Sequence, residues 1–317
     1  MRQMCLNMVY ELAKEDDRIF FVGSDLGVGT LDKFKEEMPS RFFMEGVSEA
    51  NIVGMATGLA LEGKIPYVNT IATFITRRCF EQVVLDACLH NVNVRLIGNG
   101  GGMVYAPLGP THLAIEDLAI MRAIPNMTIV SPADADEMRR FMPQTVDHQG
   151  PIYIRLAKGY DPIVTTDEHP FQIGKAIPAR EGRDALILTT GITLGVALAA
   201  ADALSEQGIE ASILHVHTVK PLDVDAILAY ADQVPAVVAI EEHTIIGGLG
   251  SAVAEVIAEA NFDQPKRFKR IGIPDVFPDQ YGSQDSLMER YSITAAELVS
   301  VTKGLVEGRP APAYVKA

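Results

Sequence analysis

The chain has no tryptophan, only three cysteines and no long apolar run among its 317 residues. Cys5, Cys79 and Cys88 are odd in number and lack a C-x-x-C spacing, which is typical of reduced thiols in a cytoplasmic protein. The apolar runs stay below the ~20 residues that a membrane-spanning helix needs. A polar, amphipathic stretch follows Met1, where a signal peptide would have an apolar core. We therefore expect a soluble cytoplasmic chain with no membrane partner.

Positive charge is also scarce. Lys and Arg number 27 against 41 for Asp and Glu, so the formal net charge is −14 and the pI is near 4.9. This is the wrong sign for binding a phosphate backbone, and we expect no nucleic-acid partner. The 48% of hydrophobic residues excludes a disordered or fibrous protein. Among the seven histidines only His215 and His217 are spaced as metal ligands, and no third ligand is evident, so no metal site is predicted.

Short apolar runs alternate with stretches of helical period along most of the chain. This alternation predicts an α/β protein with two domains, each a mostly parallel sheet flanked by helices. The pattern fails in a segment rich in Pro, Gly and charge, and it restarts with DALILTTG. We place the first domain at residues 1–165, a linker at 166–182 and the second domain at 183–317.

The binding site of an open parallel sheet lies at the carboxyl ends of its strands, where loops and helix N-termini converge. Six polar side chains are expected at this edge: Asp25, Glu49, Thr73, Asn99, His112 and Ser131. Taken alone, such residues have ordinary explanations. Ser48 is placed to cap a helix that begins at Glu49, Phe74 fits an apolar core, and Arg155 fits an ion pair.

Several longer segments change this interpretation. They are GSDL at 23–26, EGVSEANIVGMATGLAL at 45–61, TFITRRCFEQV at 73–83, GPTHLAIEDLAIMRAIPNMTIVSPADADE at 109–137 and IYIRLAKG at 152–159. In order and spacing they resemble the pyrimidine-binding domain of transketolases. In the second half, VHTVKPLD and EEHTIIGGLGSAVAE look like the C-terminal domain of the same family. The resemblance covers nearly the whole chain.

The resemblance implies thiamine diphosphate as the cofactor. In this family a buried glutamate bonds a nitrogen of the cofactor's pyrimidine ring and thereby promotes loss of a carbon-bound proton, and Glu49 matches that glutamate. Phe74 matches the aromatic that stacks on the aminopyrimidine, and Asp25 in GSDL matches a position near that ring. Arg77 departs from the second aromatic of transketolases and is instead similar to the TF-x-x-R pattern of 1-deoxyxylulose 5-phosphate synthases.

Two further residues match positions that bind substrate. His112 in GPTH matches a histidine that faces the substrate oxygens, and Arg155 in IYIRL matches an arginine that contacts the distal phosphate of the sugar. In ordinary transketolases two other polar residues bind sugar hydroxyls, and here they are replaced by Leu108 and by a glycine of GNGGGM. Such losses change which hydroxyls are recognised, so we expect a ketose other than the standard pentose and hexose phosphates.

The diphosphate-binding motif of the family is absent from the sequence. Transketolases hold the diphosphate through a divalent metal on a Gly-Asp-Gly motif with a later Asn, and Gly-Asp-Gly occurs nowhere in this chain. The resemblance therefore implies that Mg²⁺ and the diphosphate are bound by a separate N-terminal subunit. It also implies an α2β2 heterotetramer with active sites at the subunit interfaces.

The implied function is that of the C-terminal subunit of a split transketolase, which moves a two-carbon ketol unit from a ketose to an aldose phosphate. Arg77 leaves open a 1-deoxyxylulose 5-phosphate synthase reaction, and the domain layout leaves open the beta subunit of a 2-oxo acid dehydrogenase. A non-catalytic paralogue that only binds a partner or a ligand is a further alternative, motivated by the lost hydroxyl-binding side chains. Retention of Glu49, Phe74 and His112 together argues against it.

Overall fold

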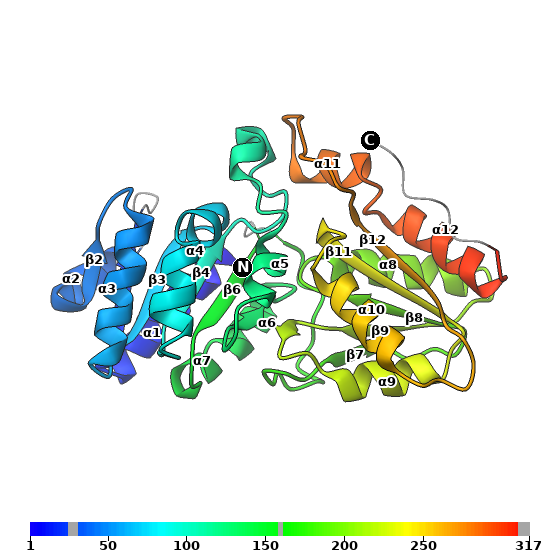
Figure 1. The fold of residues 1–317 in the computed structure, drawn as a ribbon, viewed down its shortest axis with the longest axis horizontal. Helices are drawn as coiled ribbons and strands as arrows, with labels where there is room; N and C mark the ends of the chain where they lie inside the picture. Colours follow the sequence, from blue (N-terminus) through cyan, green and yellow to red (C-terminus); the bar gives the residue numbers. More distant parts are fainter. Residues whose placement is uncertain (25–30, 158–160, 310–317) are drawn as a thin grey trace.

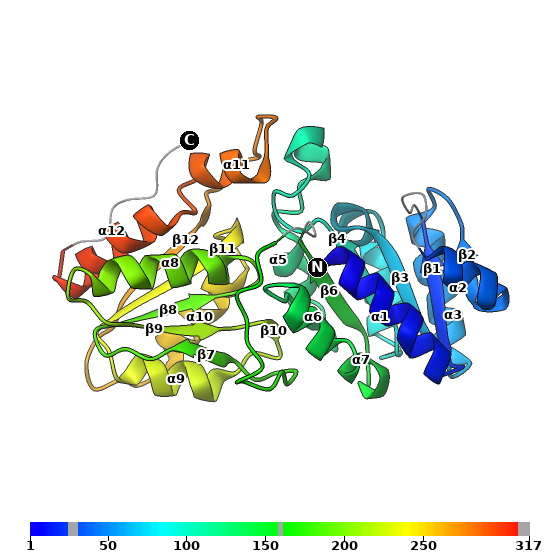
Figure 2. The ribbon, with the colours of Figure 1, turned by 180° about the vertical axis from the view of Figure 1, so that it is seen from behind.

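The computed structural model describes residues 1–24, 31–157 and 161–309. Within these ranges the chain forms two domains, each a mostly parallel sheet flanked by helices, as the sequence predicts (Figure 1 and Figure 2). None of the helices in the same ranges is both long and apolar enough to span a bilayer.

The first domain is built on a seven-stranded sheet in the order β10-β5-β6-β4-β3-β1-β2. Its parallel strands are β1 (Ile19–Gly23), β2 (Phe42–Met44), β3 (Ile65–Ile71), β4 (Arg95–Asn99), β5 (Thr128–Val130) and β6 (Ile152–Leu156). Every residue of the central strands β4 and β6 is buried, as expected for parallel strands that are covered on both faces. The carboxyl ends of the strands share one edge of the sheet.

Helices cover both faces of this sheet. On one face, α1 (Arg2–Glu15) and α6 (Ala135–Phe141) pack apolar side chains against β1, β3 and β6. On the other face lie α3 (Glu49–Leu61), η2 (Phe74–Arg78), α4 (Phe80–Gln82), η3 (Val83–Cys88) and α5 (Asp117–Arg122). The segments η2 and η3 are π-helical. The domain also contains the short helices α2 (Asp32–Glu37) and α7 (Gln144–Asp147).

The second domain has a five-stranded sheet in the order β12-β11-β8-β9-β7. Its strands are β7 (Ile177–Arg180), β8 (Ala185–Thr189), β9 (Ala211–His215), β11 (Ala236–Thr244) and β12 (Arg267–Ile273). Its helices are α8 (Thr193–Ser205), α9 (Val224–Asp232), α10 (Leu249–Glu259), α11 (Gln284–Arg290) and α12 (Ala295–Val306). Helices α8 and α12 pack on one face and α9 and α10 on the other, and the sheet begins with β7, inside the segment assigned to the linker.

One strand of the first sheet comes from the second domain. β10 (Thr218–Lys220) runs antiparallel to β5, with Thr218 opposite Val130. The chain leaves β9 at His215, and the His217 carbonyl oxygen then accepts a hydrogen bond from Ser131 N at 2.7 Å. The run EASILHVHTV (residues 210–219) is continuous in the sequence, but its residues are divided between the two sheets. The second domain closes an edge of the first sheet.

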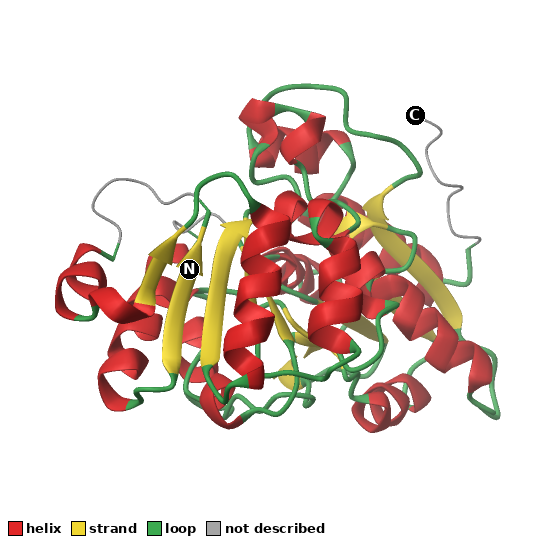
Figure 3. Cartoon of the chain, turned by 60° about the vertical axis from the view of Figure 1, so that its left-hand side comes forward, coloured by secondary structure: helices red, strands yellow, loops and turns green. Residues whose placement is uncertain are grey.

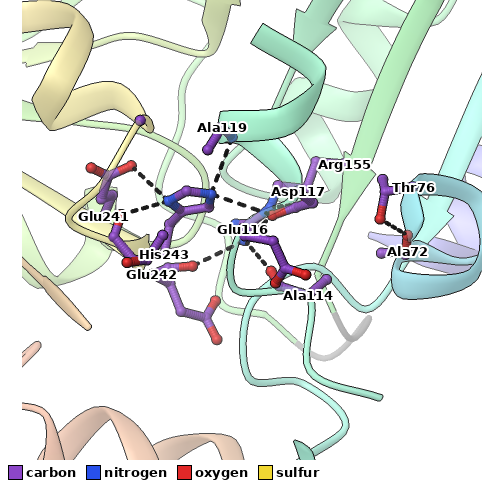
Figure 4. Close-up of polar contacts among 12 residues, drawn as sticks. Ala72, Thr76, Ala114, Glu116, Asp117, Ala119, Arg155, Glu241, Glu242 and His243 are labelled. Atoms are coloured by element: carbon purple, nitrogen blue, oxygen red, sulfur yellow. Dashed lines mark hydrogen bonds and ion pairs between the residues drawn. The ribbon is translucent and has the colours of Figure 1, made fainter. Parts of the chain in front are cut away.

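A buried ion pair marks the contact between the domains (Figure 4). The Nε of Arg155, on β6, donates to Asp117 Oδ2 at 2.7 Å, and its Nη2 donates to Asp117 Oδ1 at 3.1 Å. Nη2 also donates to the carbonyl oxygens of Ala114 and Glu242, and Glu242 belongs to β11 of the second domain. The guanidinium therefore joins β6, the start of α5 and β11.

Asp117 is held ionised by this arrangement. Burial alone would raise the pKa of its carboxyl, but the charge and hydrogen bonds of Arg155, with smaller effects of His243 and the Tyr153 hydroxyl, hold that pKa below its ordinary value. His243 Nε2 lies 3.9 Å from Asp117 Oδ1 and accepts a hydrogen bond from Ala119 N at 3.3 Å. The second domain thus contacts the first turn of α5.

Glu242 ties the loop after β4 to the second domain. Its Oε1 accepts hydrogen bonds from Met103 N at 2.6 Å and from Gln284 Nε2 at 3.0 Å. Gly102 has a φ of +67°, and a Cβ there would overlap the Glu242 carboxyl, so only glycine fits this close approach. Burial raises the pKa of Glu242 to about 7, against the lowering effects of Arg155, the Met103 N–H and Gln284.

Removal of the Arg155 guanidinium tests how far the domain contact depends on the ion pair. We expect Arg155→Met to lower the free energy of unfolding by about 3–5 kcal/mol, because it leaves the Asp117 carboxylate buried without its cation. Arg139→Met is the matched control, since Arg139 pairs with Asp136 at the surface and an exposed pair contributes about 0–1 kcal/mol. Equal losses in the two variants, measured by urea denaturation, would contradict the importance of the pair.

Glu242 predicts a pH dependence of stability. A carboxyl whose folded-state pKa is raised binds its proton more tightly in the folded chain. Its contribution is therefore complete below pH 4.5, the ordinary pKa, and is lost as the pH rises to about 7. Glu242→Gln cannot ionise, and we expect it to gain stability relative to the parent chain across this range, by about 1.4 kcal/mol for each unit of pKa shift.

The measurement is urea denaturation of both chains at several pH values. Burial lowers the pKa of His217 to about 3 and, with Arg95, that of His148 to about 4, so these two groups make stability rise with pH below pH 6.5. Subtracting the two denaturation series cancels the histidine effects. A constant difference between Glu242→Gln and the parent chain would show that Glu242 ionises normally in the folded protein.

Candidate active site

Glu49 is the first residue of α3, at the edge of the sheet where the strands end. Its side chain is only 5% exposed, and it lies in the first turn, where the helix dipole favours a carboxylate. Ser48 occupies the N-cap position without capping the helix, because its Oγ donates to the Glu45 carbonyl oxygen at 2.9 Å. Glu49 is therefore the acidic side chain at this helix start, and its Oε2 lies 3.3 Å from Arg78 Nη1.

Phe74 begins η2, directly after β3. The π-helical start is supported by Thr76, whose hydroxyl donates to the Ala72 carbonyl oxygen at 2.7 Å (Figure 4). The guanidinium carbon of Arg78 lies 3.8 Å from the centroid of the Phe74 ring. The ring of His112 meets Phe74 edge-on, with centroids 5.2 Å apart and planes inclined by 64°. The ring of Phe74 is thus half-buried between two polar groups instead of filling the core.

His112 ends the short 3-10 turn Pro110–His112, in the loop between β4 and α5. The turn follows Gly109, whose φ of +77° and close approach to the Tyr281 ring require glycine. Thr111 Oγ1 lies 2.9 Å from His112 Nδ1 and fixes that side of the ring. The other ring nitrogen, Nε2, remains for a further partner. This loop rises beside α11 in Figure 1, and Figure 3 shows helical turns projecting above the sheets at the top of the molecule.

Arg77 lies next to this group but contacts the loop. Its Nε and Nη2 form a bidentate pair with the Glu116 carboxylate, and Nη2 also donates to the Leu113 carbonyl oxygen at 2.8 Å. These contacts hold the end of the His112 loop against η2. In this structure Arg77 supports the loop, and its contact with the cofactor stays a prediction.

Arg155 is bonded within the protein. Its side chain is 6% exposed, its Nε donates to Asp117, and its Nη2 donates to Asp117 and to two carbonyl oxygens. The ion pair that the residue type alone suggests is therefore present, while the phosphate contact that the resemblance implies stays a prediction.

The remaining expectations concern Asp25 and Leu108. Asp25 lies outside the described residues, so the structure does not test its placement near the site. Leu108 is 49% exposed, in the same loop as His112.

The sequence alone did not predict the partners of the arginines, Glu116 and Asp117, although both stand in the segment GPTHLAIED. It also missed Arg78, for which the neighbouring Arg77 is the only signal.

The side chains of Glu49 and Phe74 suit the pyrimidine half of thiamine diphosphate. Glu49 offers a shielded carboxyl, Phe74 offers an aromatic face, and both are reached by the same side chain, Arg78. The diphosphate half needs a metal and oxygen ligands. In the part of the chain that the structure describes, no three His, Cys, Asp or Glu side chains are grouped so that they could hold a metal ion. Glu49 and Phe74 could therefore hold the pyrimidine ring of the cofactor.

Comparisons with known proteins agree with this geometry. A 6-deoxy-6-sulfo-D-fructose transketolase subunit of Clostridium sp. (strain MSTE9) is 40% identical over 308 residues, which cover 97% of this chain and 94% of that protein. A 1-deoxy-D-xylulose-5-phosphate synthase of Geobacter sulfurreducens is 37% identical over 96% of this chain, which spans 48% of that protein. Among solved structures, a split gene transketolase described as an inactive beta4 tetramer matches with a TM-score of 0.87 and 35% identity, over 98% of both chains.

Family models match both halves of the sequence. The transketolase pyrimidine-binding domain matches residues 1–160, and the transketolase C-terminal domain matches residues 174–298. The two matches coincide with the two sheets, and the site described above lies in the first of them. With both domains matched in order over nearly its whole length, the chain belongs to the transketolase family.

Proposed function

We propose that this chain is the C-terminal subunit of a two-subunit transketolase. The enzyme would transfer a two-carbon ketol unit from a ketose donor to an aldose phosphate acceptor. The observation that carries the proposal is the meeting of Glu49, Phe74 and His112 at the carboxyl edge of the first sheet. Dependence on thiamine diphosphate is general for the family.

Each of the three residues has a role in this reaction. When bound, thiamine diphosphate supplies a carbon nucleophile that takes up the ketol unit. Glu49 would hold a proton against a nitrogen of the pyrimidine ring, and its low exposure shields that hydrogen bond from water. Phe74 would orient the ring by stacking. His112, fixed through Nδ1 by Thr111, would present Nε2 to a substrate oxygen and move a proton there.

The missing diphosphate site supports a partner subunit. The sequence has no Gly-Asp-Gly motif, and the Clostridium relative is named as a subunit. Large apolar side chains are also exposed in the first domain, at the end of β2, in the loop before α3, and in or directly after α4 and η3: Met44, Val47, Phe80, Leu85 and Leu89. Such a patch is typical of a protein interface. The partner would bind Mg²⁺ and the diphosphate, in a cytoplasmic α2β2 heterotetramer.

The donor sugar is proposed to lie outside the standard pentose and hexose phosphates. Leu108 and the glycines of GNGGGM offer no side-chain polar group to a hydroxyl, and Gly102 is needed for the approach of Glu242. The Clostridium relative is named for a sulfonated ketose. The second candidate is 1-deoxyxylulose 5-phosphate synthesis, which Arg77 and the Geobacter relative favour. Pyruvate consumption by the reconstituted pair without ketol transfer would support that candidate and overturn the first.

Glu49 tests the catalytic assignment. In the reconstituted enzyme we expect Glu49→Gln to lower turnover by about 10²–10⁴-fold, because a positioned acid–base group contributes about that much. Glu62→Gln, at the exposed far end of the same helix, should leave turnover unchanged. Turnover of Glu49→Gln within tenfold of the parent enzyme would rule out the proposed role.

The partner requirement makes a second prediction. The isolated chain should bind thiamine diphosphate weakly even with Mg²⁺. The reason is that this chain lacks the Gly-Asp-Gly ligands for the metal that holds the charged diphosphate. Addition of an N-terminal subunit that carries Gly-Asp-Gly should produce tight binding. Calorimetry that detects tight, magnesium-dependent binding to this chain alone would contradict the divided site.

A further inference from the structure

Arg78 contacts both groups that the proposed function assigns to the pyrimidine ring. Its guanidinium carbon lies 3.8 Å from the centroid of Phe74, and its Nη1 lies 3.3 Å from Glu49 Oε2. The same planar group therefore covers the aromatic face and pairs with the carboxylate. Neither the ketol transfer proposed above nor the resemblance to transketolases gives this arginine a role.

A guanidinium and an aminopyrimidine compete for such a pair of contacts. Both are flat, both carry N–H donors in their plane, and both stack on an aromatic ring. A guanidinium over a ring is attracted by the negative face of the π system, and a guanidinium beside a carboxylate donates to it. Phe74 cannot offer one face to both groups, and Glu49 Oε2 cannot bond the ring while it accepts the hydrogen bond from Arg78.

We propose that Arg78 is an internal gate of the pyrimidine site. Its guanidinium must leave the Phe74 face and the Glu49 carboxylate before an aminopyrimidine can bind there. This inference rests on the proposed function, because it needs Glu49 and Phe74 to be the groups that receive the pyrimidine ring.

The neighbouring arginine shows why Arg78 can move. Arg77 is fixed by a bidentate pair with Glu116 and by the Leu113 carbonyl oxygen. Among the described residues the Arg78 side chain makes one hydrogen bond, to Glu49, and it is 49% exposed, so a swing toward solvent breaks this bond and the contact with Phe74. Glu49 is left behind in its buried position at the start of α3.

The size of the effect follows from the share of time that the gate is closed. If Arg78 covers the site for nine-tenths of the time, the apparent affinity for the ring falls about tenfold, because only the uncovered fraction binds. Removing the guanidinium should therefore raise the apparent affinity for the ring about tenfold, without adding a new contact to the ligand.

The test uses the full chain and a neutral probe, 4-amino-2-methylpyrimidine at about pH 8. A neutral ring responds little to the loss of one positive charge, so the comparison reports on access to the site. We expect Arg78→Ala to bind the probe about tenfold more tightly than the parent chain, measured by ligand-observed NMR titration. Arg139→Ala, a similarly exposed arginine that pairs with Asp136 and Asp167 elsewhere on the surface, should bind like the parent chain.

Two further variants separate the gate from the proposed function. In Glu49→Ala the same Arg78→Ala change should no longer tighten binding, since the two residues act on one site. Equal, weaker or undetectable binding of the probe by Arg78→Ala overturns the gate, while loss of turnover in Glu49→Gln would still support the ketol transfer. Turnover retained in Glu49→Gln would instead remove the basis of both proposals.

Discussion

The ion pair between Arg155 and Asp117 is the interaction on which the arrangement of the site depends. It lies where β6 of the first sheet, the end of the His112 loop and the end of β11 converge. A charge pair in this position is stable only while both partners stay together, since either one alone would be a buried, unpaired ion. The loop that carries His112 is therefore fixed at its far end by an all-or-none contact.

Three arginines in this region each have a different acidic partner. Arg77 pairs with Glu116, Arg78 with Glu49, and Arg155 with Asp117. They also differ in accessibility, from the half-exposed side chain of Arg78 to the buried one of Arg155. Accessibility therefore separates their functions. The buried pair fixes the domain contact, the intermediate pair fixes a loop, and the exposed pair can exchange its partner for a ligand.

The sequence predicts the elements and the meeting of Glu49, Phe74 and His112 well. Buried parallel strands give continuous apolar runs, and side chains that follow such strands share one edge of the sheet whatever the details of packing. The sequence does not predict the partners of long, flexible side chains. Arg155 stands on a strand end that suits either a phosphate or a carboxylate, and its pairing with Asp117 depends on where the distant helix α5 begins. The same holds for the division of EASILHVHTV between two sheets, which depends on the edge that β5 leaves open.

Because the second domain contributes β10 to the first sheet, the chain cannot be divided freely into separate polypeptides. Because this strand completes the first sheet from within the second domain, a break between the two domains would leave β5 with an unpaired edge and take away the hydrogen bond to Ser131. Gene fission at that boundary would therefore have to preserve the pairing of β10 with β5. This pairing favours the inheritance of the two domains together, as one unit of evolution.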